Sequence, residues 1–139
     1  MTFKQHSREV MMRDITKKSL DAFFSGKEFT RDNTGVRITN DGLVVLYLHG
    51  NAIARRPVKG ERIEVSAAGW ATSTTKERLN GLMSRVGSNL WQEDFVWYYS
   101  APYYKPSQVF NTKKGHWTVV REGSDLEQLA DVKGDWNDY

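Results

Sequence analysis

Turn signals recur at short intervals between residues 36 and 66. Asn40-Asp41-Gly42, Gly50-Asn51 and Lys59-Gly60 each separate two segments of strand-forming residues. Asn, Asp and Gly accept the positive φ angles of tight hairpin turns. Connections this short join neighbouring antiparallel strands, because parallel strands need a long crossover. The segment therefore predicts a four-stranded antiparallel meander, with strands at 36–39, 43–49, 52–56 and 62–66.

The strands of this meander differ in the exposure that we expect. The segment 43–49, LVVLYLH, is apolar at consecutive positions, which is typical of a central strand covered on both faces. Pro57 ends the strand 52–56, because proline cannot donate to a ladder of hydrogen bonds. The segment 62–66, RIEVS, alternates apolar and charged residues, and this pattern predicts a half-exposed strand.

Two helices are predicted beside the meander. Residues 9–25 carry apolar side chains at helical spacing, and Gly26 can end this helix in a left-handed conformation. Thr74 and Glu77 have the spacing of a capping box, which predicts a central helix from 75 to 86. The residues expected to face inward are Met12, Ile15, Leu20 and Phe23 in the first helix and Leu79, Leu82, Met83 and Val86 in the second.

The C-terminal part predicts further strands. Residues 95–100, FVWYYS, are strand formers, and 109–112 and 116–122 suggest a last hairpin through Lys113-Lys114-Gly115. Ser124 can cap a short helix at 125–133. The fold class is thus α+β: an N-terminal helix, the meander, the capped helix, then aromatic strands, a hairpin and a short helix. We expect one compact domain at 1–121 and an acidic C-terminal helix and tail at 122–139.

Composition limits the cellular compartments in which this chain is expected. The chain has no cysteine, which excludes disulfides, thiolate nucleophiles and iron–sulfur clusters and favours the cytoplasm. The N-terminus has charges every few residues, unlike a signal peptide. The longest apolar run, 43–48, is far shorter than the ~20 residues of a membrane helix. We therefore expect a cytoplasmic protein without a membrane partner.

Charge is distributed unevenly along the chain. Residues 1–121 contain 19 basic and 11 acidic side chains, whereas residues 122–139 contain one lysine and six acids. One interpretation is a solvated surface with a solubilising end. The other is a basic surface for a polyanion, with an acidic tail that competes for it.

The ionisable residues do not form a recognisable catalytic motif. His6 lies near the chain end, and His49 and His116 lie beside predicted turns. HExxH, GxSxG and glycine-rich phosphate loops are absent from the sequence. We therefore expect no enzyme, no catalytic residue, no cofactor and no metal site. The threonine-rich start of the central helix remains a candidate for anion binding, against which the negative charge of Glu77 would act.

Four stretches resemble a family of small proteins encoded by tailed bacteriophages. They are GKEFTRDNTGV (26–36), YLHGNAIA (47–54), AAGWATSTTKERLNGL (67–82) and FVWYYS (95–100). The resemblance implies a phage setting and a compact α+β fold, and it implies no reaction. It covers about residues 20–100. After Tyr99 the chain departs from the family pattern, so the C-terminal loop, hairpin and acidic end look like additions.

Aromatic residues gather in the second half of the chain. In FVWYYS, alternation places Phe95, Trp97 and Tyr99 on one face and Val96 and Tyr98 on the other. One face is expected to pack on the core. The other face, together with Tyr103 and Tyr104 from the following loop, forms an exposed platform if it remains uncovered.

Two functions agree with these features. The first is a non-enzymatic phage accessory protein that binds and modulates a host component, most simply a host protein, because exposed aromatic side chains are good interface anchors. The second is a single-stranded nucleic-acid-binding protein in which rings stack on bases and cations hold phosphates. The candidate binding residues are Arg55, Arg56, Lys59, Arg62, Trp97, Tyr99, Tyr103, Tyr104, Lys113 and Lys114.

Overall fold

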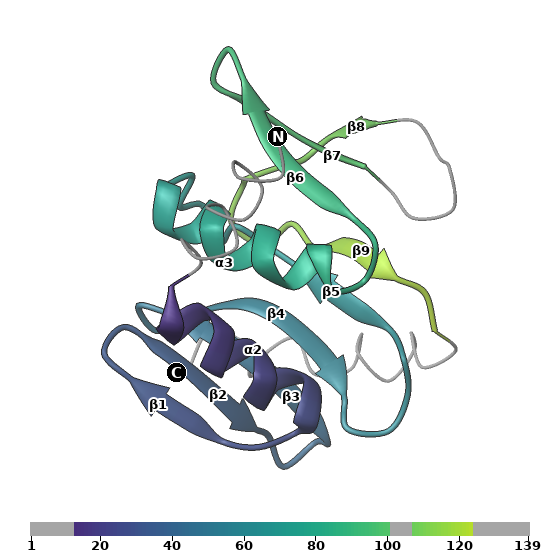
Figure 1. The fold of residues 1–139 in the computed structure, drawn as a ribbon. Coiled ribbons are helices and arrows are strands. Elements are labelled where there is room, and N and C mark those ends of the chain that lie inside the picture. Colours follow the sequence, from purple (N-terminus) through teal and green to yellow (C-terminus); the bar gives the residue numbers. More distant parts are fainter. Residues whose placement is uncertain (1–12, 101–106, 124–139) are drawn as a thin grey trace, which may run out of the picture.

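The computed structural model describes residues 13–100 and 107–123, which form two helices and two antiparallel sheets (Figure 1). No helix in these two ranges is long and apolar enough to cross a membrane. The helices are α2 (Asp14–Ser25) and α3 (Ser73–Ser84). The strands are β1 (Phe29–Arg31), β2 (Thr34–Ile38), β3 (Leu43–Leu48), β4 (Asn51–Pro57), β5 (Ile63–Val65), β6 (Asn89–Glu93), β7 (Val96–Ser100), β8 (Gln108–Val109) and β9 (Thr118–Arg121).

The larger sheet contains the predicted meander. Its strand order is β1-β2-β3-β4-β5-β9, and every neighbouring pair is antiparallel. The four predicted strands correspond to β2–β5. The structure adds β1, which pairs with β2 through a two-residue turn after Arg31. β9 joins the opposite edge by pairing with β5.

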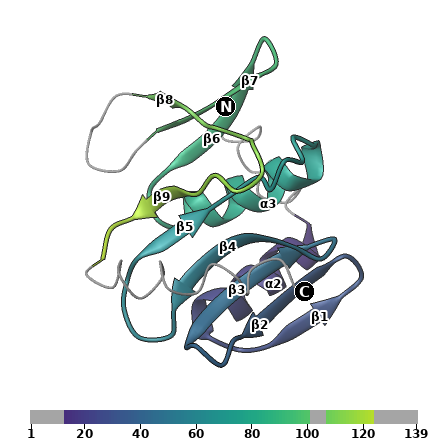
Figure 2. The ribbon, with the colours of Figure 1, turned by 180° about the vertical axis from the view of Figure 1, so that it is seen from behind.

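The two helices cover one face of this sheet. α2 lies across β1–β4, and α3 lies between the larger sheet and the smaller one, whose order is β6-β7-β8 (Figures 1 and 2). Burial of apolar area is the main stabilising term for such a layered domain. The shared core contains Leu20 and Phe23 from α2, Leu79, Leu82 and Met83 from α3, Val44 and Leu46 from β3, and Trp97 from β7.

The central position predicted for the strand at 43–49 is confirmed. All six residues of β3 are buried. Val44, Leu46 and Leu48 enter the main core, while Leu43, Val45 and Tyr47 form a second cluster on the opposite face with Ala52 and Trp117.

The helix ends differ in part from the prediction. Gly26 ends α2 as expected, with φ 71° and its amide donating to Ala22 O; the predicted first turn, 9–12, lies outside the described residues. The predicted cap of the central helix is wrong. Thr72 is the N-cap, and its Oγ1 accepts from the Thr75 amide at 3.2 Å. α3 ends at Ser84, so Val86 packs on the core from beyond the helix.

The half-exposed strand predicted at 62–66 is also wrong. All three residues of β5 are buried: β5 is an inner strand that pairs with β4 and β9, and Ile63 and Val65 lie in the main core. The charged residue of this strand, Glu64, is 4% exposed and pairs with two arginines. A buried carboxylate is tolerated when cations and hydrogen bonds compensate its lost hydration.

The predicted last hairpin does not form. Residues 108–109 pair with β7 in the smaller sheet, whereas residues 118–121 pair with β5 in the larger one. The two segments therefore pair with strands of different sheets, and the stretch between them crosses from one sheet to the other. The predicted helix at 125–133 and the tail beyond it lie outside the described residues.

Candidate functional site

Three of the predicted phosphate-binding arginines are engaged inside the fold. Arg55 and Arg62 hold opposite oxygens of Glu64, with Arg55 Nη2 2.6 Å from Oε1 and Arg62 Nε 2.9 Å from Oε2. Arg55 also lies over the Trp117 ring, 3.9 Å from its centroid. Burial lowers the pKa of the Arg55 guanidinium. These contacts fix the β4–β5 pair.

Arg56 stabilises the end of α2. Its Nε donates to Phe23 O at 2.9 Å and its Nη2 donates to Phe24 O at 3.1 Å. Cations at a helix C-terminus satisfy its free carbonyls and interact favourably with its dipole. By contrast, Lys59, Lys113 and Lys114 are exposed. Of the six basic residues predicted to bind, the three lysines are therefore the ones available to a ligand.

The predicted aromatic residues lie mainly on the inner face of the smaller sheet. Trp97 is buried against Phe110, and half-buried Tyr99 packs edge-on against the same ring. The Tyr99 hydroxyl donates to Gln108 Oε1 at 3.0 Å, and burial raises the pKa of Tyr99. Tyr103 and Tyr104 lie outside the described residues.

The opposite side of this sheet carries a second set of apolar side chains, which we call the outward face. Register places Trp91 opposite Tyr98, and Tyr98 opposite Val109. The Trp91 and Tyr98 rings are stacked, with centroids 6.2 Å apart. Val96 and Val109 are 39% and 63% exposed. Alternation correctly placed Val96 and Tyr98 away from Trp97. Trp91 was missed because β6 was not predicted as a strand, and Val109 because its strand was expected to pair in a last hairpin and not with β7.

Phe95 occupies the tip of the β6–β7 hairpin. Glu93 pairs with Val96, so Asp94 and Phe95 form a two-residue turn, with φ angles of 49° and 69°. The prediction that Phe95 shares a strand face with Trp97 and Tyr99 is wrong, because the turn takes Phe95 out of the strand and leaves it 93% exposed. Glu93 and Asp94 beside it are exposed acids.

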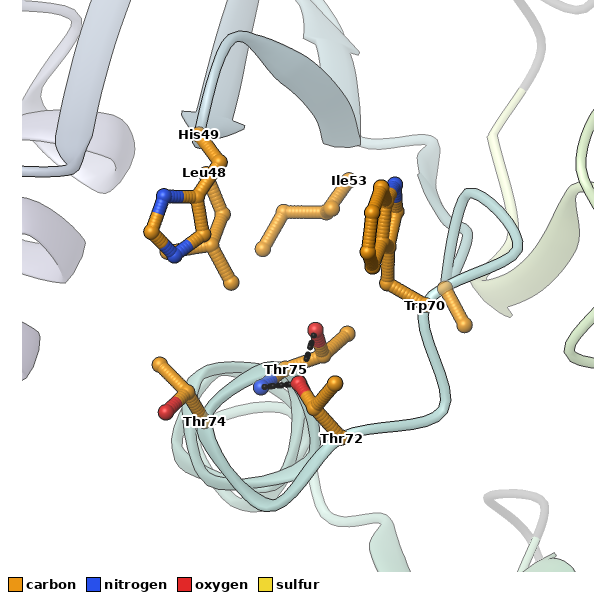
Figure 3. A pocket seen from close by; sticks show the side chains of 8 residues that line it. Leu48, His49, Ile53, Trp70, Thr72, Thr74 and Thr75 are labelled. Carbon is orange, nitrogen blue, oxygen red and sulfur yellow. Dashed lines mark hydrogen bonds between the residues drawn. The ribbon is translucent and has the colours of Figure 1, made fainter.

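A pocket of about 430 Å³ opens between the β3–β4 turn and the first turn of α3 (Figure 3). The rings of His49 and Trp70 stand on opposite sides of it, with Leu48 and Ile53 between them. The remaining lining residues are Ala67, Thr72, Thr74 and Thr75. The lining thus combines two rings, an apolar floor and hydroxyl groups.

Two tight turns with positive φ position these rings. His49 and Gly50 have φ angles of 51° and 79°, so the turn is one residue earlier than the predicted Gly50-Asn51. Ala68 and Gly69, at 54° and 82°, form the turn that presents Trp70. The Trp70 amide donates to Ala67 O at 2.8 Å, which closes this second turn.

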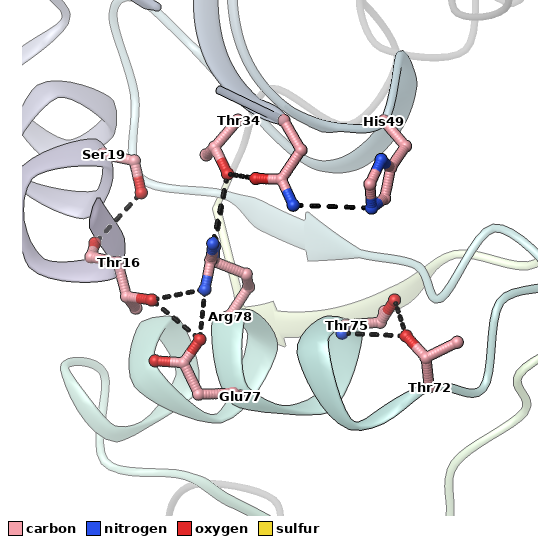
Figure 4. Close-up of polar contacts among 9 residues, drawn as sticks. Thr16, Ser19, Thr34, His49, Thr72, Thr75, Glu77 and Arg78 are labelled. Atoms are coloured by element: carbon pink, nitrogen blue, oxygen red, sulfur yellow. Dashed lines mark hydrogen bonds and ion pairs between the residues drawn. The ribbon is translucent and has the colours of Figure 1, made fainter. Parts of the chain in front are cut away.

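A buried polar network runs behind the pocket (Figure 4). Arg78 is fully buried and pairs with Glu77. Its guanidinium also donates to Thr16 Oγ1 at 2.6 Å and to Thr34 Oγ1 at 3.3 Å. Glu77 is therefore turned toward α2 and away from the start of its own helix. This engagement explains why Glu77 does not complete the predicted capping box.

The network continues to the pocket edge. Thr34 Oγ1 donates to Asn33 Oδ1 at 2.8 Å, and Asn33 Nδ2 lies 3.4 Å from His49 Nε2. In residues 13–100 and 107–123, no group of three or more histidine or carboxylate side chains is arranged to hold a metal ion.

The family model of the Kyanoviridae Gp96 protein matches residues 12–127. The chain belongs to this family. Membership confirms the predicted setting in a family of small bacteriophage proteins. No match was found among curated proteins or among solved structures.

The extent of the Gp96 match corrects one expectation. The family pattern was expected to end after Tyr99, yet the match continues through β8 and β9 to residue 127. β9 completes the larger sheet and β8 completes the smaller one, so these strands are part of the Gp96 fold. The matched range includes the outward face, Phe95 and every residue that lines the pocket.

Proposed function

We propose that this Gp96 family member is a non-enzymatic phage accessory protein that binds a host protein in the host cytoplasm. The binding surface is the outward face (Trp91, Val96, Tyr98 and Val109) together with Phe95 at the hairpin tip. The partner is a protein with an apolar socket for the Phe95 ring.

Phe95 carries this proposal. A bulky residue with positive φ is uncommon, and its backbone conformation costs roughly 1 kcal/mol relative to a glycine. Asn or Gly would suit this turn better. The ring is 93% exposed, so core packing does not offset this cost. A residue that is unfavourable for the turn and absent from the core is best explained by a contact outside the chain.

The neighbouring side chains supply the rest of an interface. Trp91 and Tyr98 offer a stacked, half-buried pair of rings, and tryptophan and tyrosine are enriched among residues that dominate binding energy. Val96 extends the apolar area toward the tip, and Val109 extends it across the sheet onto β8. Exposed Glu93 and Asp94 flank Phe95, so charge complementarity favours a socket with basic side chains at its rim.

Single-stranded nucleic acid fits this surface less well. Glu93 and Asp94 would repel phosphates beside the hairpin tip. Arg55, Arg56 and Arg62, which were expected to hold phosphates, are bound to Glu64 or to helix carbonyls. The outward face therefore combines aromatic rings with negative charge, which repels a polyanion.

Site-specific photo-crosslinking tests the proposal. p-Benzoylphenylalanine placed at position 95 keeps an aromatic ring at the tip. We expect it to crosslink one host protein in nuclease-treated host lysate. The same residue placed at position 38 is the matched control, because Ile38 is also exposed, at 39%, but belongs to the larger sheet.

The crosslinked band should appear with the probe at position 95 and be absent with the probe at position 38. An excess of wild-type protein, which lacks the photo-reactive residue, should compete for the host protein and remove this band. An absence of any competed crosslink at position 95, or the same pattern from both positions, would contradict the proposed surface.

A further inference from the structure

We infer that the pocket between Trp70 and His49 binds a nucleobase, and that the adjacent lysines favour its phosphorylated form. This site is distinct from the outward face and does not rest on the proposed function. It assigns a small planar ligand to a part of the fold that host-protein binding does not use.

The two rings define the shape of the ligand. Trp70 and His49 stand on opposite sides of the pocket, and Leu48 and Ile53 close the space between them (Figure 3). The volume of about 430 Å³ lies within the range of small-molecule sites. Trp70 is 57% exposed, so its ring already lies at the surface to stack on a planar group. Bases stack well on aromatic side chains.

The polar groups that line the pocket define the chemistry of the ligand. Among the described residues, those lining the pocket include no carboxylate, lysine or arginine, so the buried part of the ligand is neutral. The Thr74 hydroxyl makes no hydrogen bond to the described residues, whereas the Thr72 and Thr75 hydroxyls bond each other. Thr74 and the His49 ring can therefore donate to and accept from the edge of a base.

The walls are held in place without a ligand. His49 is oriented by Asn33, which is fixed in turn by Thr34 and buried Arg78 (Figure 4). On the other side, Ser66 Oγ accepts from the Ala68 amide at 3.0 Å. The Gly69 amide donates to Thr112 O at 3.0 Å. A preformed pocket avoids part of the ordering cost of binding.

A positive segment lies against the Trp70 turn. A Cβ atom at Gly69 would be 3.3 Å from Lys114 Cβ, so the two backbones pack closely. Lys113 and Lys114 are both exposed. Neither lysine lines the pocket, so we expect a phosphate attached to the base to extend along the Trp70 turn to reach them, as cations hold phosphates in nucleic-acid sites. This location gives two of the predicted phosphate-binding residues a role.

Titration followed by NMR tests the inference. Adenosine, AMP and a short single-stranded oligo(dA) are added separately to the ¹⁵N-labelled protein. The Trp70 indole N–H signal is monitored in the wild type, and the backbone amide signals of the lining residues His49 and Thr74 are monitored in the wild type and in the Trp70 variants. We expect saturable shifts with all three probes and tighter binding of AMP than of adenosine. Trp70→Ala should weaken AMP binding about tenfold, since stacking contributes ~1–3 kcal/mol per base. Trp70→Phe should retain most of it.

Two comparisons identify the source of the base and the role of the lysines. Equal affinity for AMP and for oligo(dA) indicates a free nucleotide, and a clear preference for oligo(dA) that weakens with salt indicates a nucleic-acid strand. The double variant Lys113→Ala/Lys114→Ala should bind AMP with the lower affinity that it has for adenosine.

The inference fails if no probe produces saturable shifts, or if Trp70→Ala leaves AMP affinity unchanged in a folded protein. Phe95→Asn separates this site from the proposed interface. Loss of host-protein binding with intact AMP binding supports two independent sites. Loss of AMP binding in Phe95→Asn would contradict the assignment to the Trp70 pocket.

Discussion

Arg78 is a buried cation whose charge is balanced inside the fold. It joins α3 to α2 through Thr16 and to β2 through Thr34, while Glu77 supplies the counter-charge. Removing one member of a buried pair leaves the other without its partner, which costs more than the pair itself contributes. Arg78 is therefore expected to be among the charged residues on which the fold depends most.

Substitution of Arg78 tests this role. Arg78→Met should lower the free energy of unfolding by about 3 kcal/mol, because Glu77 and two hydroxyls lose their donor. Adding Glu77→Gln should recover part of this loss. Urea unfolding monitored by circular dichroism measures both effects.

Arg85→Met, at the C-cap of the same helix, is the matched control. Arg85 pairs with Asp21 at 2.9 Å, and both side chains are partly exposed. Exposed ion pairs contribute at most about 1 kcal/mol. Equal losses from Arg78→Met and Arg85→Met would show that burial of the Arg78 network does not matter.

At the scale of elements, the start of α3 shows how a correct pattern can be assigned to the wrong residue. Thr74 and Glu77 have capping-box spacing, yet Thr72 caps the helix. A sequence shows which residues can cap. It does not show that Glu77 is recruited by Thr16, which is 61 residues away.

The cap assignment leads to a paired prediction. Thr72→Ala should destabilise the protein by about 1 kcal/mol, the usual cost of losing an N-cap side chain. Thr74→Ala should change stability by less than about 0.5 kcal/mol, since the Thr74 hydroxyl makes no hydrogen bond to the described residues. Thermal unfolding of the two variants measures the difference. A larger loss from Thr74→Ala would restore the capping box first inferred.

Elements formed by local signals were predictable, and those formed by distant pairing were not. The turns after β2 and β3 and the end of α2 at Gly26 follow from local chemistry. β9 could not be placed because its partner, β5, lies about 55 residues earlier in the chain. Arg55 and Arg62 both pair with buried Glu64 of β5, so their apparent availability in the sequence was misleading.

The candidate surface was predictable in part. Period-two alternation separated Val96 and Tyr98 from Trp97. It could not assign Phe95, because the sequence Asp94-Phe95 contains no glycine or asparagine to mark a tight turn. The pocket depends on two turns, at His49 and at Trp70, that are distant in sequence and lie on opposite sides of it.

On the scale of the whole molecule, one core fastens the smaller sheet to the larger one. Trp97, Leu90 and Phe110 from the smaller sheet share a cluster with Leu20, Val44 and Val120. The outward face therefore belongs to a layer that is anchored on its inner side. This architecture holds the proposed interface on strands and leaves the hairpin tip free to enter a partner.

The account depends most on Phe95 serving a partner and not the fold. The direct measurement compares wild-type protein with Phe95→Asn, using the host protein identified by crosslinking and urea unfolding of the same samples. We predict that Phe95→Asn weakens binding of the purified partner at least about 30-fold, equivalent to about 2 kcal/mol. Its free energy of unfolding should be equal to or higher than that of the wild type, because asparagine tolerates positive φ. Unchanged affinity together with lower stability would show that Phe95 supports the fold, and would contradict the proposed function.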